Sequence, residues 1–200
     1  LENSETWIQF ILDQPMYAEP GTVFQYNDGA SVLLGKILQE VTGKRVDAWA
    51  REKLFSPIGI DEFYWKITPD GEADTEGGLY LSAHDLARIG YLFLRDGLWD
   101  GKRVISQNWV RRSVASIVPS GATGDNSSPY GYGYQWWVPE NGKGHALGFG
   151  GFGLGGQRVM VFPDDDVVVV FQGWDPVGEY WKASNAFQTT VLPASLAKPE

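Results

Sequence analysis

Tyr26 occupies a point in the sequence where a side chain with an exchangeable proton could do chemistry. A proline-glycine turn leads into it, and an amphipathic helical pattern starts directly after Asn27 and Asp28. A structural interpretation makes Tyr26 a packing residue and Asp28 a helix cap. A catalytic interpretation makes Tyr26 a proton-transfer residue in a hydrolase cleft. That role requires a nearby ammonium group, because a phenol that titrates near pH 10 is otherwise a poor base.

Other motifs of nucleophilic catalysis are absent or badly placed. No G-x-S-x-G elbow occurs, so the sequence does not predict an α/β-hydrolase. Ser195 and Lys198 have the Ser-x-x-Lys spacing that lets an amine take the hydroxyl proton. However, the motif ends two residues before the last residue, and Pro199 prevents a continuing helix. We therefore predict that Ser195 is not a nucleophile, because a chain end does not hold catalytic geometry.

Composition excludes several functions. The 200 residues are 43% hydrophobic and 14% aromatic, which suits one globular domain or part of a larger one. The 16 basic and 25 acidic residues give a net charge of −9, so nucleic acid and anionic membranes are disfavoured as partners. There is no cysteine and there are only two histidines, so we predict no metal site and no cofactor. No apolar run approaches the length of a membrane span.

Helical patterns dominate residues 1–118. The most secure helix starts at Asp28 and ends at Gly43, which is predicted to be a left-handed C-cap. Its apolar positions recur at a three-four spacing: Ala30, Leu33, Leu34, Ile37, Leu38 and Val41. A short helix is predicted over about 46–54, followed by an irregular acidic loop over 55–78. Further helices are predicted from Ser82 to Gly97 and after the cap Ser106.

Strand patterns dominate residues 131–172. Short β-branched and aromatic runs alternate with turn signals there, which predicts an antiparallel meander. A helical pattern returns over 178–192 and is expected to cover one face of the sheet. The sequence thus predicts an α+β fold, with one domain built from the helical segment 1–118 and from the strands and C-terminal helix of 131–200.

Four strings in order carry a family resemblance that runs from about residue 19 to residue 174. They are "EPGTVFQYNDGASVLLGKILQEVTG", "GGLYLSAHDLARIGYLFLRDGLWDGKRVISQNWV", "YGYGYQWW" and "GFGGFGLGGQRVMVFPDDDVVVVF". As a set, the strings resemble the serine hydrolases related to class C β-lactamases, D-alanyl-D-alanine carboxypeptidases and 6-aminohexanoate-dimer hydrolase. Members of this family carry a Ser-x-x-Lys, a Tyr-x-Asn and a Lys/His-Ser/Thr-Gly. Only the second and third motifs have counterparts here.

The resemblance implies that Tyr26 is the general base or proton relay beside the nucleophilic serine. Asp28 stands where the family has asparagine. It is expected to cap the following helix and to orient the lysine or a substrate amide. Replacing an amide by a carboxylate removes a donor and adds a charge, which argues against recognition of β-lactam-like amides.

The third motif aligns with Gly151, Phe152 and Gly153, without the usual lysine or histidine. The resemblance implies that these residues let a substrate approach the strand edge, and that the Leu154 backbone N–H is an oxyanion donor. We expect the Phe152 side chain to point away from the cavity. The structural alternative is that these glycines only permit a bulge or tight sheet packing.

Two tryptophans are candidate substrate contacts. Trp136 lies in an aromatic run in which one face is predicted to pack in the core and the other to line the cleft. Trp174 follows the last predicted strand, and aromatic rings offer stacking surfaces to ligands.

The expected function is therefore part of a serine hydrolase that cleaves a small-molecule ester or amide through an acyl-enzyme. The family's serine and lysine precede the tyrosine by a long stretch, so we expect this chain to be the C-terminal part, which is either completed by a separate N-terminal fragment or truncated. The family resemblance favours an extracytoplasmic location. The alternative is a non-catalytic binding relative of the same fold.

Overall fold

The computed structural model describes residues 1, 3–119, 130–140, 145–174 and 189–190. The chain divides into two compact units, residues 1–82 and residues 83–200.

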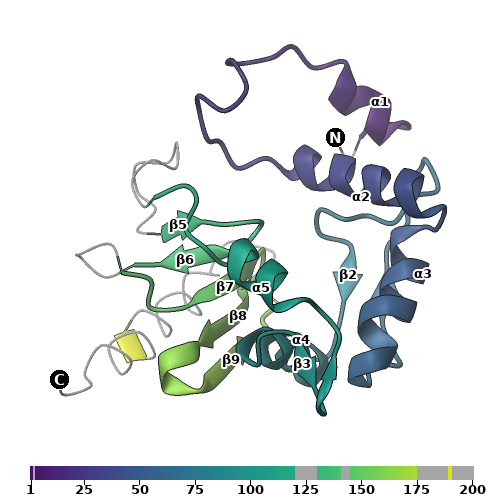
Figure 1. The fold of residues 1–200 in the computed structure, drawn as a ribbon. Coiled ribbons are helices and arrows are strands. Elements are labelled where there is room, and N and C mark those ends of the chain that lie inside the picture. The colour runs from purple at the N-terminus through teal and green to yellow at the C-terminus, as the bar shows by residue number, and fades with distance from the viewer. Residues whose placement is uncertain (2, 120–129, 141–144, 175–188, 191–200) are drawn as a thin grey trace. The chain divides into compact units, whose positions relative to one another are not determined.

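Helices are the main regular elements of the first unit (Figure 1). Helix α1 spans Trp7–Leu12, α2 spans Asp28–Thr42 and α3 spans Val46–Ala50. Helix α3 continues into a π-helical turn, Arg51–Phe55, and a 3-10 turn, Ser56–Ile58. The prediction of a short helix over about 46–54 is thus confirmed, with a change of winding at residue 51.

Helix α2 carries Tyr26 at its N-terminal approach. Gly43 ends it in the left-handed conformation with φ 67°, as predicted from its position after the last apolar residue. The face that contains Gly29 and Val32 is buried. A Cβ at Gly29 would lie 3.3 Å from Ile11 Cγ1, so the glycine allows α1 to pack closely on α2.

The core of the first unit is built from α1, from the helical turns that follow α3 and from the segment before the first strand. Its fully buried large side chains are Trp7, Phe55, Ile58 and Ile60. Strand β1, Tyr64–Trp65, pairs antiparallel with β2, Leu79–Tyr80. The segment 55–78 is therefore less irregular than predicted, because it contains a helical turn and β1.

A five-stranded antiparallel sheet forms the centre of the second unit. In the order of the sheet its strands are β5 Tyr130–Tyr132, β6 Trp137–Pro139, β7 Phe149–Gly153, β8 Gln157–Phe162 and β9 Val167–Phe171. Sequence order and spatial order coincide, so the predicted meander is confirmed. With helices packed on this sheet, the prediction of an α+β fold is also confirmed.

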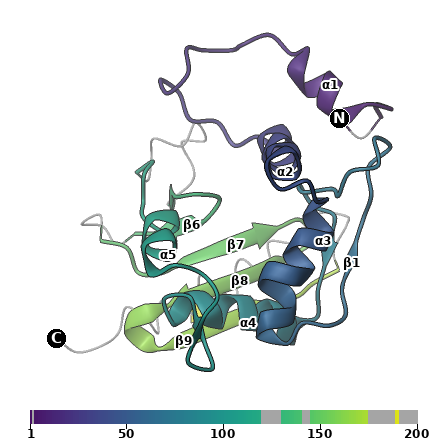
Figure 2. The ribbon, with the colours of Figure 1, turned by 45° about the vertical axis from the view of Figure 1, so that its right-hand side comes forward.

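Helix α4, Ala83–Leu94, covers one face of β8 and β9 (Figures 1 and 2). Gly90 makes the close approach possible, because a Cβ there would lie 2.6 Å from Val168 Cγ1. The buried residues Val138, Phe149 and Val161 pack on this side of the sheet. The predicted helix over 178–192 lies largely outside the described residues.

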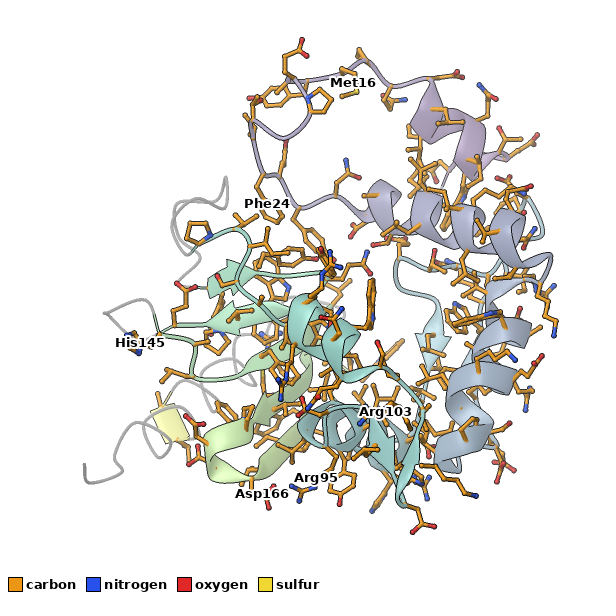
Figure 3. All side chains as sticks on the ribbon, in the orientation of Figure 1. Met16, Phe24, Arg95, Arg103, His145 and Asp166 are labelled. Carbon is orange, nitrogen blue, oxygen red and sulfur yellow. The ribbon has the colours of Figure 1, made fainter. Side chains whose placement is uncertain are left out.

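Shorter elements complete the second unit. Strands β3, Leu98–Trp99, and β4, Lys102–Arg103, form a hairpin. Helix α5, Gln107–Ser113, is capped by Ser106, whose Oγ accepts a hydrogen bond from the backbone N–H of Trp109 at 3.2 Å, as predicted. Between β8 and β9 a 3-10 turn ends at Asp166, which lies beside Arg95 in Figure 3 and pairs with it at 2.7 Å.

Candidate active site

A turn at residues 19–22 directs the chain towards Tyr26. The Thr22 backbone N–H and hydroxyl both donate to the Glu19 carbonyl, at 3.2 and 2.7 Å, and Gly21 adopts φ 81°. The chain is extended at Asn27 (φ −149°) before it enters α2. Tyr26 is thereby held one residue before a helix N-terminus, with its side chain half exposed.

Asp28 is the first residue of α2 and not its cap. The N-cap is Asn27, which makes no capping hydrogen bond through its side chain. The expectation that Asp28 caps the helix is therefore wrong by one position, because Asp28 already has helical geometry. Its carboxylate instead accepts a hydrogen bond from the Tyr26 hydroxyl. A negative charge in the first turn also interacts favourably with the helix dipole.

The surroundings of Tyr26 are acidic. Burial raises the pKa of its phenol above the ordinary value, the charge and hydrogen bond of Asp28 raise it further, and the charge of Glu76 adds to both. Each effect disfavours the phenolate. These groups favour the protonated phenol, and the role of Tyr26 as a general base or proton relay stays a prediction.

Glu76 is brought near Tyr26 by a turn that is fixed to α2. The buried Asp74 accepts hydrogen bonds through Oδ1 from the backbone N–H groups of Glu76 and Gly77, at 3.1 and 3.3 Å. The Thr75 hydroxyl donates to the Ser31 carbonyl of α2 at 2.8 Å. Sequence reasoning missed Asp74 and Glu76. The available signal was an aspartate three residues before a glycine pair, which is typical of an Asx-type turn.

The glycine-rich strand belongs to the second unit and ends in a tight hairpin. Gly153 pairs with Gln157, and the loop between them contains Gly155 and Gly156 at φ 80° and 93°. Leu154, at the start of the loop, is 83% exposed. A Cβ at Gly153 would lie 2.9 Å from Gln157 Cβ, so the neighbour across the hairpin limits the space there.

Gln157 connects this hairpin to the chain after β9. Its Oε1 accepts a hydrogen bond from the Gly173 backbone N–H at 3.3 Å, and its Nε2 donates to the Gly173 carbonyl. Trp174 follows directly and is 86% exposed. The structure thus brings Gly153, Leu154 and Trp174 to the same end of the sheet. Gln157, which makes this possible, was not among the predicted site residues.

The remaining predicted residues lie on two faces of the sheet. Gly151 faces Val159, on the side covered by α4, and Trp136 packs there against Phe93 and Phe149 at ring-centroid distances of 4.7 and 5.3 Å. Phe152 lies on the opposite face, where it stacks on Trp137 and packs against Met160 and Phe162. The Phe152 side chain is therefore a packing residue in this structure.

Tyr26 lies in the first unit and the Leu154 amide in the second, and a cavity shared by the two stays a prediction. Among the residues that the structure describes, no group of three or more acidic or histidine side chains is arranged to hold a metal ion. None of the helices in the described ranges is both long and apolar enough to cross a membrane.

Comparison with known proteins places these features in a family. The sequence model of the Beta-lactamase family matches residues 1–179. The 6-aminohexanoate-dimer hydrolase of Paenarthrobacter ureafaciens is 32% identical over 166 residues, which cover 79% of this chain and 41% of that protein. Penicillin-binding protein 4 of Amycolatopsis lactamdurans is 25% identical over 163 residues, 66% of this chain and 43% of that protein.

Solved structures show the same similarity. A Bacillus anthracis protein, provisionally named a 6-aminohexanoate-dimer hydrolase, superposes with a TM-score of 0.78 at 26% identity, covering 98% of this chain and 50% of that one. A penicillin-binding protein homologue from Caulobacter crescentus shares the fold, with a TM-score of 0.67 at 16% identity. The chain thus spans half or less of the length of the curated relatives and of the Bacillus anthracis protein.

Proposed function

The chain belongs to the Beta-lactamase family, and on that premise we propose that it is part of a serine hydrolase that cleaves an ester or amide bond through an acyl-enzyme. The 200 residues form the C-terminal part of the hydrolase domain. A polypeptide segment outside them supplies the Ser-x-x-Lys. This division is supported by the share of the relatives that the chain covers, 41% and 50% of two of them.

The observation that carries the proposal is the setting of Tyr26. Its phenol is half exposed at the N-terminus of α2 and donates a hydrogen bond to Asp28, in a chain that matches the family across the site. A protonated phenol next to a carboxylate can pass a proton between a nucleophile and a leaving group once a cation offsets the negative charge. The lysine of the Ser-x-x-Lys is that cation.

The exposed hairpin after β7 supplies the other half of the proposed chemistry. A backbone N–H in a glycine-rich turn can approach a developing oxyanion closely, and one such donor accounts for a hundredfold or more of rate in comparable hydrolases. Leu154 carries this N–H, and Gly153 precedes it. Trp174, held beside the hairpin through Gln157 and Gly173, offers an apolar surface to the substrate.

The test is Tyr26→Phe in the complete hydrolase. Removing the hydroxyl should cut turnover of a short-chain p-nitrophenyl ester by about a hundredfold or more, because proton transfer contributes rate factors of this order. Tyr64→Phe is the matched control, since Tyr64 is an exposed tyrosine of the same unit. Its turnover should equal that of the parent. Activity of Tyr26→Phe within a few-fold of the parent would exclude Tyr26 from catalysis.

A non-catalytic binding relative is the second candidate, and one observation favours it. The pKa of Tyr26 is raised and not lowered, and a carboxylate replaces the family's amide beside it. Intact-mass analysis of the native preparation separates the two candidates. A longer polypeptide, or a second one, that carries a Ser-x-x-Lys supports the hydrolase. A preparation with neither supports the binding relative.

A further inference from the structure

Helix α2 has apolar residues on two opposite sides. One side carries the buried Gly29 and Val32 and faces the rest of the first unit. Gly35 is on this side too, where a Cβ would lie 2.6 Å from the Thr75 hydroxyl oxygen. A surface helix normally has one apolar face and one polar face, and a helix that is apolar on two sides is typical of a buried helix.

The opposite side of α2 forms an exposed apolar stripe. We define the stripe as Ala30, Leu34, Ile37 and Val41. At 100° per residue, these positions fall within about 60° of the helix circumference and extend over ~16 Å of its axis. Leu34 is 54% exposed, Ile37 57% and Val41 81%. The sequence pattern placed these residues on one apolar helix face, and in the described part of the chain they are exposed.

Such a stripe marks an interaction surface. Single exposed apolar residues are normal, but contiguous apolar strips on monomeric proteins usually mark interaction sites. The charged residues near it are largely engaged, because Lys36 pairs with Glu40 and Glu72, both at 2.9 Å. An apolar partner therefore fits the stripe better than a charged one.

We infer that the stripe of α2 is the docking surface for the remainder of the hydrolase domain, a polypeptide segment outside these 200 residues that covers it with an apolar face. The inference rests on the proposed function. The length of the relatives indicates what covers the stripe. The chain covers half or less of their length, and it superposes on half of one of them with a TM-score of 0.78. The other half of that fold needs an apolar surface on which to pack, and α2 offers one.

The experiment compares Ile37→Lys in two preparations, the complete hydrolase and the 200-residue chain. Lysine is at least as good a helix former as isoleucine, so the change does not weaken α2 itself. In the complete hydrolase, a lysine forced into the covered interface should lower Tm by about 5 °C or more. In the 200-residue chain Tm should not move. Ile117→Lys, at an isoleucine of nearly equal exposure (54%), is the matched control and should leave both preparations unchanged.

Three outcomes overturn the inference. A fall in Tm in the 200-residue chain would mean that another part of the same chain covers the stripe. An unchanged Tm in an active complete hydrolase would refute the interface and leave the proposed function standing. If the native protein contains no polypeptide beyond these 200 residues, no further segment exists to cover the stripe. Conversely, if Ile37→Lys lowers Tm in a complete protein whose parent form is inactive, the interface is supported and the proposed hydrolase activity is refuted.

Discussion

At the residue scale, the carboxylate at position 28 is one of the features that distinguish this chain from the family pattern. An asparagine would present a neutral amide to the Tyr26 hydroxyl, whereas Asp28 presents a charge that holds the proton on the phenol. Glu76 adds a second negative charge from a distant turn. In the proposed hydrolase the lysine of the Ser-x-x-Lys would offset these charges, and the pKa of the Tyr26 phenol should then fall in the complete protein.

Asp28→Asn should lower the pKa of Tyr26 towards its ordinary value, because it removes both the charge and the acceptor that favour the protonated form. The direction of the Tyr26 pKa shift can be checked through the pH dependence of the free energy of unfolding. With a folded-state pKa above the unfolded value of about 10, Tyr26 loses its stabilising contribution as pH rises from about 10 through the folded pKa. The variant should lose less stability over that window.

The measurement is a pH titration of the Tyr26 ring-carbon NMR signal, assigned by its absence in Tyr26→Phe, together with urea unfolding at neutral and alkaline pH. Asp61→Asn removes another exposed carboxylate of the same unit and should leave the titration unchanged. An equal pKa in Asp28→Asn and in the parent would mean that burial and Glu76, without Asp28, hold the proton on Tyr26.

At the scale of elements, the contact of α4 with the sheet fixes the position of the β7–β8 hairpin. Gly90 lets the helix backbone approach β8 and β9, where Val168, Val159 and Val161 occupy the space that a side chain would need. Because β7 pairs with β8 along its whole length, the strand that carries Gly153 depends on this packing. The end of the hairpin is then fixed by Gln157.

Gly90→Val should lower the free energy of unfolding by about 1–3 kcal/mol, as overpacking in a tight interior does. Its Cβ alone would lie 2.6 Å from Val168 Cγ1. Ala83→Val, at the exposed first residue of the same helix, is the control for the lower helix propensity of valine. Urea unfolding measures both. Equal free energies for the two variants would mean that α4 shifts on the sheet without cost.

At the scale of the whole molecule, the chain carries the tyrosine side and the glycine-strand side of the proposed site in separate units of one polypeptide. Its net charge of −9 makes a polyanionic ligand an unfavourable partner. A neutral or cationic small molecule is compatible with this charge. Ser195 and Lys198, which have the Ser-x-x-Lys spacing, lie outside the described residues, and the proposed division assigns the nucleophile to a segment outside these 200 residues.

The 200-residue chain should therefore show no labelling by a fluorophosphonate probe, whereas the complete hydrolase should be labelled at one serine outside these residues. Mass spectrometry of tryptic peptides identifies the modified residue. Boiled protein controls for non-specific reaction. Modification of any serine in the 200-residue chain would contradict the proposed division, and modification of Ser195 would show that its motif is functional.

The sequence by itself determined the local features of this protein and its family. The three-four spacing and Gly43 predicted α2, and Ser106 predicted the start of α5. Short β-branched and aromatic runs separated by turn signals predicted the antiparallel meander, but not its number of strands. These features depend on backbone sterics and on hydrogen bonds between near neighbours, which short stretches of sequence encode. Four ordered strings were enough to indicate the family.

Only the tertiary structure decided which side chains from distant segments meet. It brought Glu76 near Tyr26 through a turn fixed to α2, joined Gln157 to Gly173 and left one side of α2 in solvent. It also placed the helix cap at Asn27 and turned Asp28 towards the phenol. Periodicity identifies an apolar face but not its partner, because burial depends on contacts between segments that lie far apart in the sequence.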